Sequence, residues 1–485
     1  MEKIINILDK SKNNRNAKIF CGDKSCSYSD IYEKAKIQKE LILEFGKSKA
    51  VIMFMENSIE FIETFFAIHM ANKVPVMLSV MENEKTVQKT VCTMKSSLII
   101  TDSKHRPLVF RALKCIDFSC YVLNVDVMKI SVCGIPTVLL VGNDEELDDV
   151  AAIIKTSGTT NLSKLVMLTH KGIIQNIKAH ISSVQLDKDD RTLIVLPMCF
   201  GYCFSSQLMA HLFLGAQIVI SNNIFIPQDF LSKIYEYGIT NTTIVPSMLF
   251  VMNKYLKWDD KRIKSLKKII FGGMMCNLNS LNDLNRKANK VTIIQTYGQT
   301  EHSPRITTKV YDKQEITDLS NVGKPINGVQ LKINSENGEI CVKSDQIMKG
   351  YYGQIEATNE AIVDGWLHTG DKGYLDCSGD LHIQGRIKNI IIRNGINISV
   401  EAVEEVIRMA EEVKEVLVFS EKNEVDGENI VAKIVLSDFE NLENVKSKII
   451  ENCRENLAVY MYPNRLEFVK ELEHTINGKV KRYGN

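Results

Sequence analysis

A loop rich in hydroxyl groups, residues 156–161, separates two apolar runs of the chain. Its sequence is Thr156-Ser157-Gly158-Thr159-Thr160-Asn161, and Lys164 follows three residues later. The backbone N–H groups and hydroxyls of such a loop can donate to phosphate oxygens, and the lysine adds a positive charge. It is not a Walker A loop, because Ser163 precedes the lysine where that motif requires glycine. An ordinary Ser/Thr-rich turn is the alternative interpretation.

An aromatic ring and a carboxylate follow a second apolar run, residues 291–295. The residues are Tyr297-Gly298-Gln299-Thr300-Glu301. A tyrosine in this position can stack on a purine, and a carboxylate next to a phosphate loop can hold Mg²⁺, which prefers hard oxygen ligands. Taken alone, the segment is equally consistent with a plain turn.

Two further groups of residues lie toward the end of the chain. His368-Thr369-Gly370-Asp371 offers a carboxylate that can accept the hydroxyls of a ribose, and Gly385-Arg386-Ile387-Lys388 follows it. The last group is Thr475-Ile476-Asn477-Gly478-Lys479, where a basic terminus is usually a solvated tail. No G-x-G-x-x-G segment opens a helix, which argues against a dinucleotide dehydrogenase.

Apolar spacing predicts the elements that position these groups. Strands are expected at residues 50–55, 74–78, 192–197, 217–221, 241–246, 267–273 and 291–298, with helical patterns between them. This alternation is typical of parallel sheets, whose ligands bind beyond the carboxyl ends of the strands. Asn57 is expected to cap the helix that follows the first strand, and Pro75 to limit its strand to a sheet edge or a strand start. Residues from about 305 to 344 are expected to be β-rich.

Composition excludes several classes of protein. The chain has 60 Lys+Arg against 59 Asp+Glu, so its net charge of +1 gives no overall attraction to nucleic acid or anionic membranes. It has no secretory signal and no run of about 18 apolar residues, and we expect a cytoplasmic protein without a membrane span. The 12 cysteines are expected to be reduced core thiols, and His211 a core histidine.

In their order and spacing, these groups of residues resemble the adenylate-forming superfamily, which includes acyl-CoA synthetases, aryl-acid ligases, luciferases and adenylation domains of peptide synthetases. The resemblance runs from about residue 25 to about residue 482. It implies an α/β fold with a large multi-subdomain body, residues 1–387, built of mainly parallel layered sheets and a β-rich subdomain. Residues 388–485 would form a small mobile α+β lid.

The resemblance also implies a ligase that runs two half-reactions. A small carboxylic acid attacks the α-phosphorus of MgATP, and a pantetheine thiol of coenzyme A or of a separate carrier protein then takes the acyl group. Joining two anions requires positive charge and Mg²⁺ to offset their repulsion. We expect a monomer or homodimer that binds no nucleic acid. A homologue that holds nucleotide or acyl adenylate without turnover is the alternative.

Matching positions imply roles for individual residues. The expected ligands of the β- and γ-phosphates are Thr156, Ser157, Gly158, Thr159, Thr160 and Lys164. Those expected around the α-phosphate and Mg²⁺ are Thr300, Glu301 and Thr160. Those expected around adenine and ribose are Tyr297, Gly272, Gly273, Met274, Asp371 and Arg386. Lys479 is the expected catalytic lysine, Lys388 the hinge between half-reactions, and Arg393 and Gly395 are expected at the thiol tunnel.

Residues 196–206 match the segment that lines the acyl pocket. Relatives that activate amino acids carry an aspartate there, whereas Phe200-Gly201 offers no carboxylate to pair with an ammonium. We therefore expect an aryl or a short- to medium-chain acyl acid. The expected walls are Phe200, Gly201, Ser247, Gly273, Gly298 and Gln299. Alternatively, Phe200 and Tyr202 only fill the core.

The chain departs from the family pattern at Asn161, Ser163 and Leu165, where relatives usually have Gly, Pro and Gly. None of these changes removes a charged group that the chemistry requires, so activity is expected. The sequence leaves open the acid, the thiol acceptor, the oligomeric state and the effect of the altered loop on activity.

Overall fold

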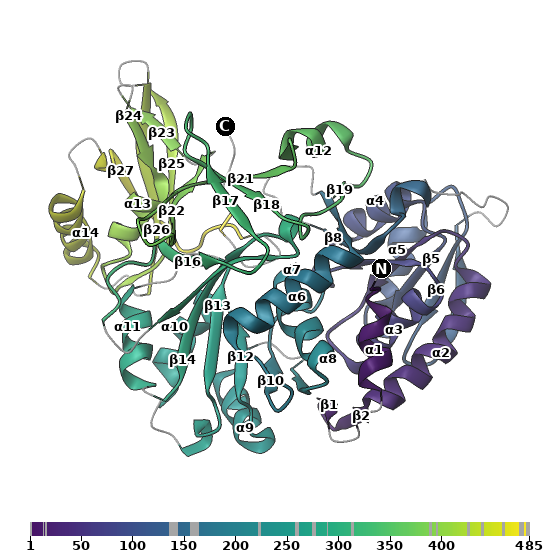
Figure 1. Ribbon diagram of the computed structural model, residues 1–485. Coiled ribbons are helices and arrows are strands. Elements are labelled where there is room, and N and C mark those ends of the chain that lie inside the picture. The colour runs from purple at the N-terminus through teal and green to yellow at the C-terminus, as the bar shows by residue number, and fades with distance from the viewer. Residues whose placement is uncertain are drawn as a thin grey trace.

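The apolar runs of the sequence form buried strands in two large sheets, and a smaller unit follows them (Figure 1). The computed structural model describes residues 2–12, 14, 17–134, 144–155, 164–221, 225–257, 261–273, 278–288, 290–311, 315–387, 390–393, 396–423, 427–437, 441–457, 461–474 and 480–481. Within them, no helix is both long enough and apolar enough to cross a bilayer.

The first sheet has eight strands in the order β19-β9-β8-β4-β3-β5-β6-β7. Their bounds are β3 (Ala50–Phe54), β4 (Val74–Leu78), β5 (Leu98–Thr101), β6 (Cys120–Asn124), β7 (Lys129–Cys133), β8 (Val150–Lys155), β9 (Leu165–Thr169) and β19 (Gly350–Tyr351). The five strands from β8 to β6 run parallel. β3 and β4 are buried along their whole length, as expected of parallel strands covered on both faces.

The second sheet has fourteen strands, of which thirteen follow the order β17-β18-β21-β22-β16-β15-β14-β13-β12-β10-β11-β1-β2. The parallel strands are β1 (Lys18–Cys21), β10 (Arg191–Ile194), β11 (Gln217–Ile220), β12 (Asn241–Ile244), β13 (Lys268–Gly272) and β14 (Thr292–Gly298). The others are β2 (Lys24–Ser27), β15 (Arg305–Tyr311), β16 (Asn321–Pro325), β17 (Gln330–Ile333), β18 (Glu339–Lys343), β20 (Ile362–Val363), β21 (Trp366–Leu375) and β22 (Leu381–Arg386). The expected β-rich region is therefore hydrogen-bonded into this sheet and extends to Arg386.

Helices separate and cover the two sheets. The helices of the body are α1 (Ile5–Ser11), α2 (Tyr28–Phe45), α3 (Ile59–Met70), α4 (Glu84–Met94), α5 (Arg106–Leu113), α6 (His170–Val184), α7 (Gly201–Cys203), α8 (Ala210–Leu214), α9 (Pro227–Tyr237), α10 (Pro246–Tyr255), α11 (Leu278–Lys287) and α12 (Ile355–Ala361), with a π-helix, η2, at Phe204–Met209. One core joins side chains of both sheets with α3 and α6. Separate clusters join the second sheet with α9–α11 and the first with α4 and α5, which gives alternating α and β layers.

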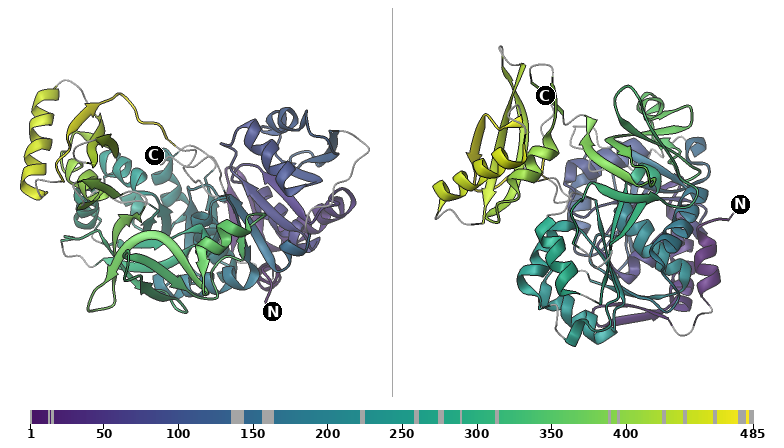
Figure 2. Two further views of the ribbon diagram at one scale, coloured as in Figure 1. Left: turned by 90° about the horizontal axis from the view of Figure 1, so that it is seen from above. Right: turned by 60° about the vertical axis from the view of Figure 1, so that its left-hand side comes forward.

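The C-terminal unit has a hydrophobic core of its own. It consists of β23 (Ile390–Arg393), β24 (Ile396–Ser399), α13 (Val400–Ile407), β25 (Val413–Asn423), β26 (Gly427–Leu436), α14 (Leu442–Asn456) and β27 (Arg465–Phe468). Val403, Ile407, Val418 and Ile434 belong to a cluster that draws all its members from this unit. Figure 2 shows the unit to one side of the body. The α/β class, the layered sheets, the β-rich region and the α+β unit that the sequence predicts are confirmed.

The predicted cap of α3 is wrong by one residue. Ser58 is the N-cap, and its hydroxyl accepts from the N–H of Phe61. Asn57 is used elsewhere: its side chain donates to the carbonyl of Leu196 at 2.8 Å and accepts from the N–H of Met198 at 2.8 Å. Since either residue type can cap a helix, only the contact with a distant segment decides between them.

Other predictions about single residues have mixed outcomes. Pro75 is the second residue of β4, which lies between β3 and β8, so an edge position is wrong. The pairing of β4 with β8 begins only at Val76, so this ladder needs no N–H from residue 75. His211 is a buried core residue whose Nδ1 lies 2.7 Å from the carbonyl of Gln207.

The prediction that the cysteines are reduced core thiols holds for most of those described, which are free and buried. Three described cysteines are exposed and contradict it: Cys92, Cys115 and Cys377.

Asn57→Ala should destabilise the protein more than Ser58→Ala. The first change removes two hydrogen bonds to partly buried backbone groups, which should cost about 2 kcal/mol. The second removes one helix cap, at about 1 kcal/mol. Melting temperatures of the full-length variants would check the order, and a larger loss for Ser58→Ala would contradict it.

Candidate active site

The predicted site residues follow the carboxyl ends of strands in both sheets. β8 ends at Lys155, one residue before the hydroxyl-rich loop, and β13 and β14 end at Gly272 and Gly298. Several predicted residues lie outside the described part of the chain: Thr156, Ser157, Gly158, Thr159, Thr160, Met274, Lys388, Gly395 and Lys479. Three others are located by their backbones alone: Ser247 on α10, Arg386 on β22 and Arg393 on β23.

An ion pair fixes the chain where it enters the hydroxyl-rich loop. The ammonium of Lys155 lies 2.6 Å from a carboxylate oxygen of Glu82, and both side chains are largely buried. Glu82 comes from the segment after β4, the strand next to β8. Because few solvent molecules screen this pair, its attraction is stronger than that of a surface ion pair. The end of β8 is thereby tied to the segment that follows β4.

Tyr297 and Asp371, 74 residues apart in sequence, are in direct contact. The phenol of Tyr297, at the end of β14, donates to Asp371 Oδ2 at 2.6 Å, and both residues are buried. Asp371 lies in β21, directly opposite Arg386 of β22 in the strand register. The structure therefore brings together the residues predicted to hold the adenine and the ribose.

A buried carboxylate fixes the turn that leads to Asp371. Glu339 on β18 accepts from the N–H of Gly370 at 2.9 Å, and its other oxygen lies 2.8 Å from His368 Nδ1. Cys341 Sγ lies 3.8 Å from the same ring nitrogen, so these three side chains could also hold a metal ion. Both oxygens of Glu339 are already engaged, and we assign the group a structural role in positioning Asp371.

Glu301 and Lys164 are joined through a tyrosine that sequence reasoning missed. The hydroxyl of Tyr351 donates to Glu301 Oε1 at 3.0 Å, and Lys164 Nζ lies 4.1 Å from the centre of the Tyr351 ring. Tyr351 reaches this position because β19 pairs with β9, with Tyr351 opposite Val166. The carboxylate predicted for Mg²⁺ and the ammonium predicted for phosphate thus share one phenol.

The state of this phenol follows from its surroundings. Burial, and then the neighbouring Glu301 carboxylate, raise the pKa of Tyr351 above its ordinary value. The phenol therefore stays protonated at neutral pH and donates to the carboxylate. Glu301 and Thr300 lie on a short 3₁₀ turn, and the carbonyl of Glu301 accepts from the N–H of Met348 at 2.8 Å. An oxygen ligand for a hard cation is thereby held in one orientation.

The predicted walls of the acyl pocket lie next to this turn. A Cβ added to Gly201 would lie 3.5 Å from Thr300 Oγ1, so Gly201 lies beside the turn that carries Thr300 and Glu301. At Gly298 a Cβ would lie 1.9 Å from the carbonyl oxygen of Pro304, and only glycine permits this approach of two backbone segments. Phe200 is partly buried and packs against the central core. Tyr202 packs against the same core, and its hydroxyl lies 3.2 Å from Thr296 Oγ1.

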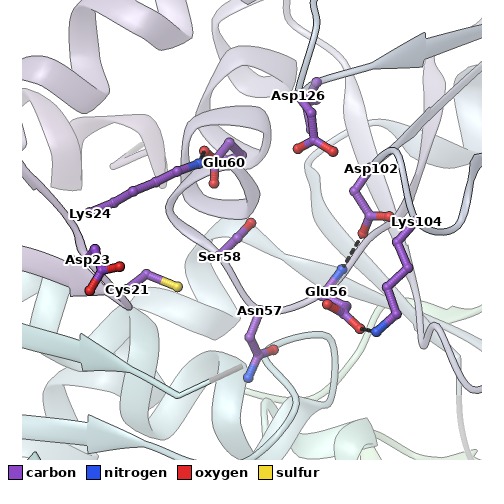
Figure 3. A pocket seen from close by; sticks show the side chains of 11 residues that line it. Cys21, Asp23, Lys24, Glu56, Asn57, Ser58, Glu60, Asp102, Lys104 and Asp126 are labelled. Carbon is purple, nitrogen blue, oxygen red and sulfur yellow. Dashed lines mark hydrogen bonds and ion pairs between the residues drawn. The ribbon is translucent and has the colours of Figure 1, made fainter. Parts of the chain in front are cut away.

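A cavity of about 430 Å³ lies away from these residues, beyond the carboxyl ends of β3, β5 and β6 (Figure 3). Two of its five carboxylates are paired with its two lysines: Glu60 with Lys24 at 2.7 Å and Glu56 with Lys104 at 2.5 Å. Asp102 accepts from the N–H of Glu56 at 3.0 Å. None of the predicted site residues lines this cavity, and we do not assign it to the site.

Comparison with known proteins agrees with the geometry. A model of the AMP-binding enzyme family matches residues 8–352, and a model of the AMP-binding enzyme C-terminal domain matches residues 402–479. The 4-coumarate--CoA ligase 2 of Nicotiana tabacum is 26% identical over 462 residues, which cover 89% of this chain and 83% of that protein. The 2-succinylbenzoate--CoA ligase of Bacillus pumilus (strain SAFR-032) is 31% identical over 358 residues, which cover 72% of this chain and 71% of that protein.

Solved structures of similar fold come from the same kinds of enzyme. The o-succinylbenzoate CoA synthetase (MenE) of Bacillus subtilis, in complex with the acyl-adenylate intermediate OSB-AMP, has a TM-score of 0.85 at 23% identity and covers 98% of this chain and 97% of that chain. The anthranilate CoA ligase AuaEII, in complex with anthranoyl-AMP, has a TM-score of 0.85 at 19% identity, covering 99% of this chain and 96% of that chain. At these identities the similarity establishes the fold.

The resemblance read from the sequence is confirmed by these matches. The family model spans most of the chain, and the α/β body with its α+β unit has the fold of adenylate-forming enzymes. The chain therefore belongs to the AMP-binding enzyme family and is a ligase.

Proposed function

We propose that this enzyme joins a carboxylic acid to a pantetheine thiol through an acyl adenylate, with ATP and Mg²⁺. The observation that carries the proposal is the contact of Glu301 and Lys164 with one phenol, Tyr351. A carboxylate for a hard cation and an ammonium for phosphate oxygens then meet where a metal-bound triphosphate would lie.

Tyr297 and Asp371 would hold the nucleoside. The ring of Tyr297 would lie along the adenine beside Gly272 and Gly273, with Met274 on the same wall. The carboxylate of Asp371, which accepts from Tyr297 at 2.6 Å, would also accept the ribose hydroxyls. Arg386, opposite Asp371 in the register, would lie nearby.

In the first half-reaction an oxygen of the acid attacks the α-phosphorus, and the bond to pyrophosphate breaks. Thr300, the residues Thr156–Thr160 and Lys164 would donate to phosphate oxygens, and Lys479 would bridge the acid and the α-phosphate. Bound Mg²⁺, for which Glu301 and Thr160 offer oxygen ligands, would offset phosphate charge. Since two anions must meet, these positive groups supply much of the rate enhancement.

In the second half-reaction the thiol sulfur attacks the acyl carbonyl, and AMP leaves. We propose that residues 388–485 form a lid that changes orientation between the steps, with Lys388 as its hinge. After this change the face of the lid that carries Arg393 and Gly395 would point into the site in place of the face that carries Lys479. Arg393 and Gly395 would then line the path of the pantetheine. The names of the related ligases support coenzyme A as the first acceptor to test, before a separate carrier protein.

The acid would be an aryl or a short- to medium-chain acyl acid. Phe200, Gly201, Ser247, Gly298 and Gln299 would line its pocket. The described walls offer no carboxylate to an α-ammonium, which argues against an α-amino acid. The related 4-coumarate and 2-succinylbenzoate ligases are consistent with an aromatic acid.

Acid-dependent exchange of pyrophosphate into ATP would test the proposal. A panel of acids including 4-coumarate, 2-succinylbenzoate, benzoate and hexanoate would be assayed, and thioesters would be detected by mass with coenzyme A or a carrier protein. At least one acid should support exchange, and Lys479→Ala should slow it by roughly 10²–10³. Tight AMP binding with no exchange for any acid would instead favour the non-catalytic alternative.

Tyr351→Phe should lower kcat/KM for ATP. The change removes the donor to Glu301, a hydrogen bond to a charged group whose loss corresponds to about 10- to 100-fold. Rates would be measured at saturating acid over a range of Mg²⁺ concentrations, with the exposed Tyr374→Phe as the control. Equal kcat/KM and equal Mg²⁺ dependence in Tyr351→Phe and the wild type would contradict the role of this phenol.

Asp371→Asn should reduce the preference for ATP over 2′-deoxy-ATP. The carboxylate forms charge-assisted hydrogen bonds with ribose hydroxyls, which are about twice as strong as neutral ones. The wild type should therefore discriminate strongly between the two nucleotides and the variant weakly. Unchanged discrimination in the variant would show that Asp371 does not contact the ribose hydroxyl.

A further inference from the structure

Arg305 is a cation buried without a negative partner. It is the first residue of β15, and its exposed fraction is 1%. Of its five N–H donors, Nε donates to His180 Nδ1 at 3.3 Å, whereas Nη2 has no hydrogen-bond partner. In the described part of the chain no carboxylate forms an ion pair with it. Burying an uncompensated charge is strongly unfavourable, so this position calls for an anion.

The groups packed around the guanidinium do not supply that anion. Its central carbon lies 5.2 Å from the centre of the Tyr202 ring. Burial lowers the pKa of His180 well below its ordinary value, so its ring is uncharged at neutral pH. The neighbour that favours the charged guanidinium is therefore the neutral Tyr202 side chain, through its ring face and its hydroxyl, and a neutral phenol is a weak substitute for a carboxylate.

Arg305 touches both segments that are predicted to form the acyl pocket: its guanidinium lies against Tyr202, and its backbone lies against Gly298. Arg305 follows the turn at residues 299–304, and a Cβ on Gly298 would lie 3.1 Å from its Cα. Tyr202 directly follows Gly201, which faces Thr300. The arginine thus lies behind the predicted pocket walls, on the strand that leaves the reacting end of the site.

Other buried donors on these segments also lack partners. Gln299 Nε2 and Ser205 Oγ make no hydrogen bond within the described residues. Ser205 lies in the π-helix η2, and such helical irregularities are frequent at functional sites. Within residues 199–207 and 297–305, each unpartnered side-chain atom can donate, so the pocket is suited to an acceptor-rich ligand.

We propose that the acid substrate carries a second carboxylate at its far end and that Arg305 binds it. This inference rests on the proposed function: one carboxylate reacts beside Thr300, and the other pairs with the guanidinium. A planar guanidinium can donate two parallel hydrogen bonds to a carboxylate. Arg305 is then a specificity-determining residue, and a substrate with an apolar end would leave its charge unpaired.

Pairs of acids that differ only in the terminal carboxylate would test this. Hexanoate would be compared with adipate, and 3-phenylpropanoate with 3-(4-carboxyphenyl)propanoate, by acid-dependent pyrophosphate exchange. A site built to bind a polar group rejects the analogue without it strongly, so the wild type should favour one of the diacids by roughly 10²–10⁴ in kcat/KM. Arg305→Met should abolish or reverse that preference, and Arg305→Lys should keep part of it.

The control variant is Arg286→Met, which removes an exposed arginine that pairs with Asp283 on α11. It should leave the diacid preference unchanged. Thermal melting of each variant, with and without diacid, reports folding and binding independently of catalysis. If Arg305→Met does not fold, the wild-type preference and the Arg305→Lys variant decide the question.

The failures of the two proposals can be told apart. Exchange with monoacids as fast as with diacids would overturn the role of Arg305 while the ligase function stands. An equal loss for both members of a pair in a folded Arg305→Met variant would also overturn it, since Arg305 would then be structural. If no acid supports exchange, the ligase proposal fails. The anion site is then judged by thermal melting: a diacid that stabilises the wild type but not Arg305→Met supports it. If no diacid stabilises the wild type, the anion site is overturned as well.

Discussion

The site depends on the close approach of two backbone segments at Gly298. The N–H of Gln299 donates to the carbonyl of Pro304 at 2.9 Å, in a turn that any Cβ at position 298 would obstruct. This one contact sets where β14 ends and β15 begins. Tyr297 before the turn, Glu301 within it and Arg305 after it owe their positions to the same constraint, so the residues proposed to bind nucleotide, metal and acid share one structural origin.

The charged groups of the site are positioned by their immediate neighbours. The net charge of +1 gives no overall field, and the charged groups of the site are held by buried neutral side chains or by each other. Tyr351 lies between Lys164 and Glu301, with its ring against the ammonium and its hydroxyl on the carboxylate. Glu339 engages Gly370 and His368 and so orients the strand that carries Asp371. Rigid donors and acceptors of this kind favour binding of a charged substrate because little reorganisation is needed.

Much of the fold follows from local patterns. Buried β-branched runs such as Val74–Leu78 identify the parallel strands, and the change of pattern near Arg305 marks the antiparallel half of the second sheet. Residues such as Tyr351 and Glu339 could not be found in this way, because their partners are distant in sequence and only strand register brings them together. The prediction that Asn57 caps α3 is wrong for the same reason, because its actual partners, Leu196 and Met198, are distant in sequence. Arg305 carries no motif, and its burial without a counter-ion is visible only in three dimensions.

The separate core of the C-terminal unit has a mechanical consequence. All members of the cluster that contains Val403 and Ile434 come from that unit. A rigid-body rotation of the unit, as proposed for the lid, would therefore leave this core intact. For the proposed lid, the energy of reorientation would then depend on the contacts between the unit and the body and on the ligand in the site, and not on unfolding of the unit.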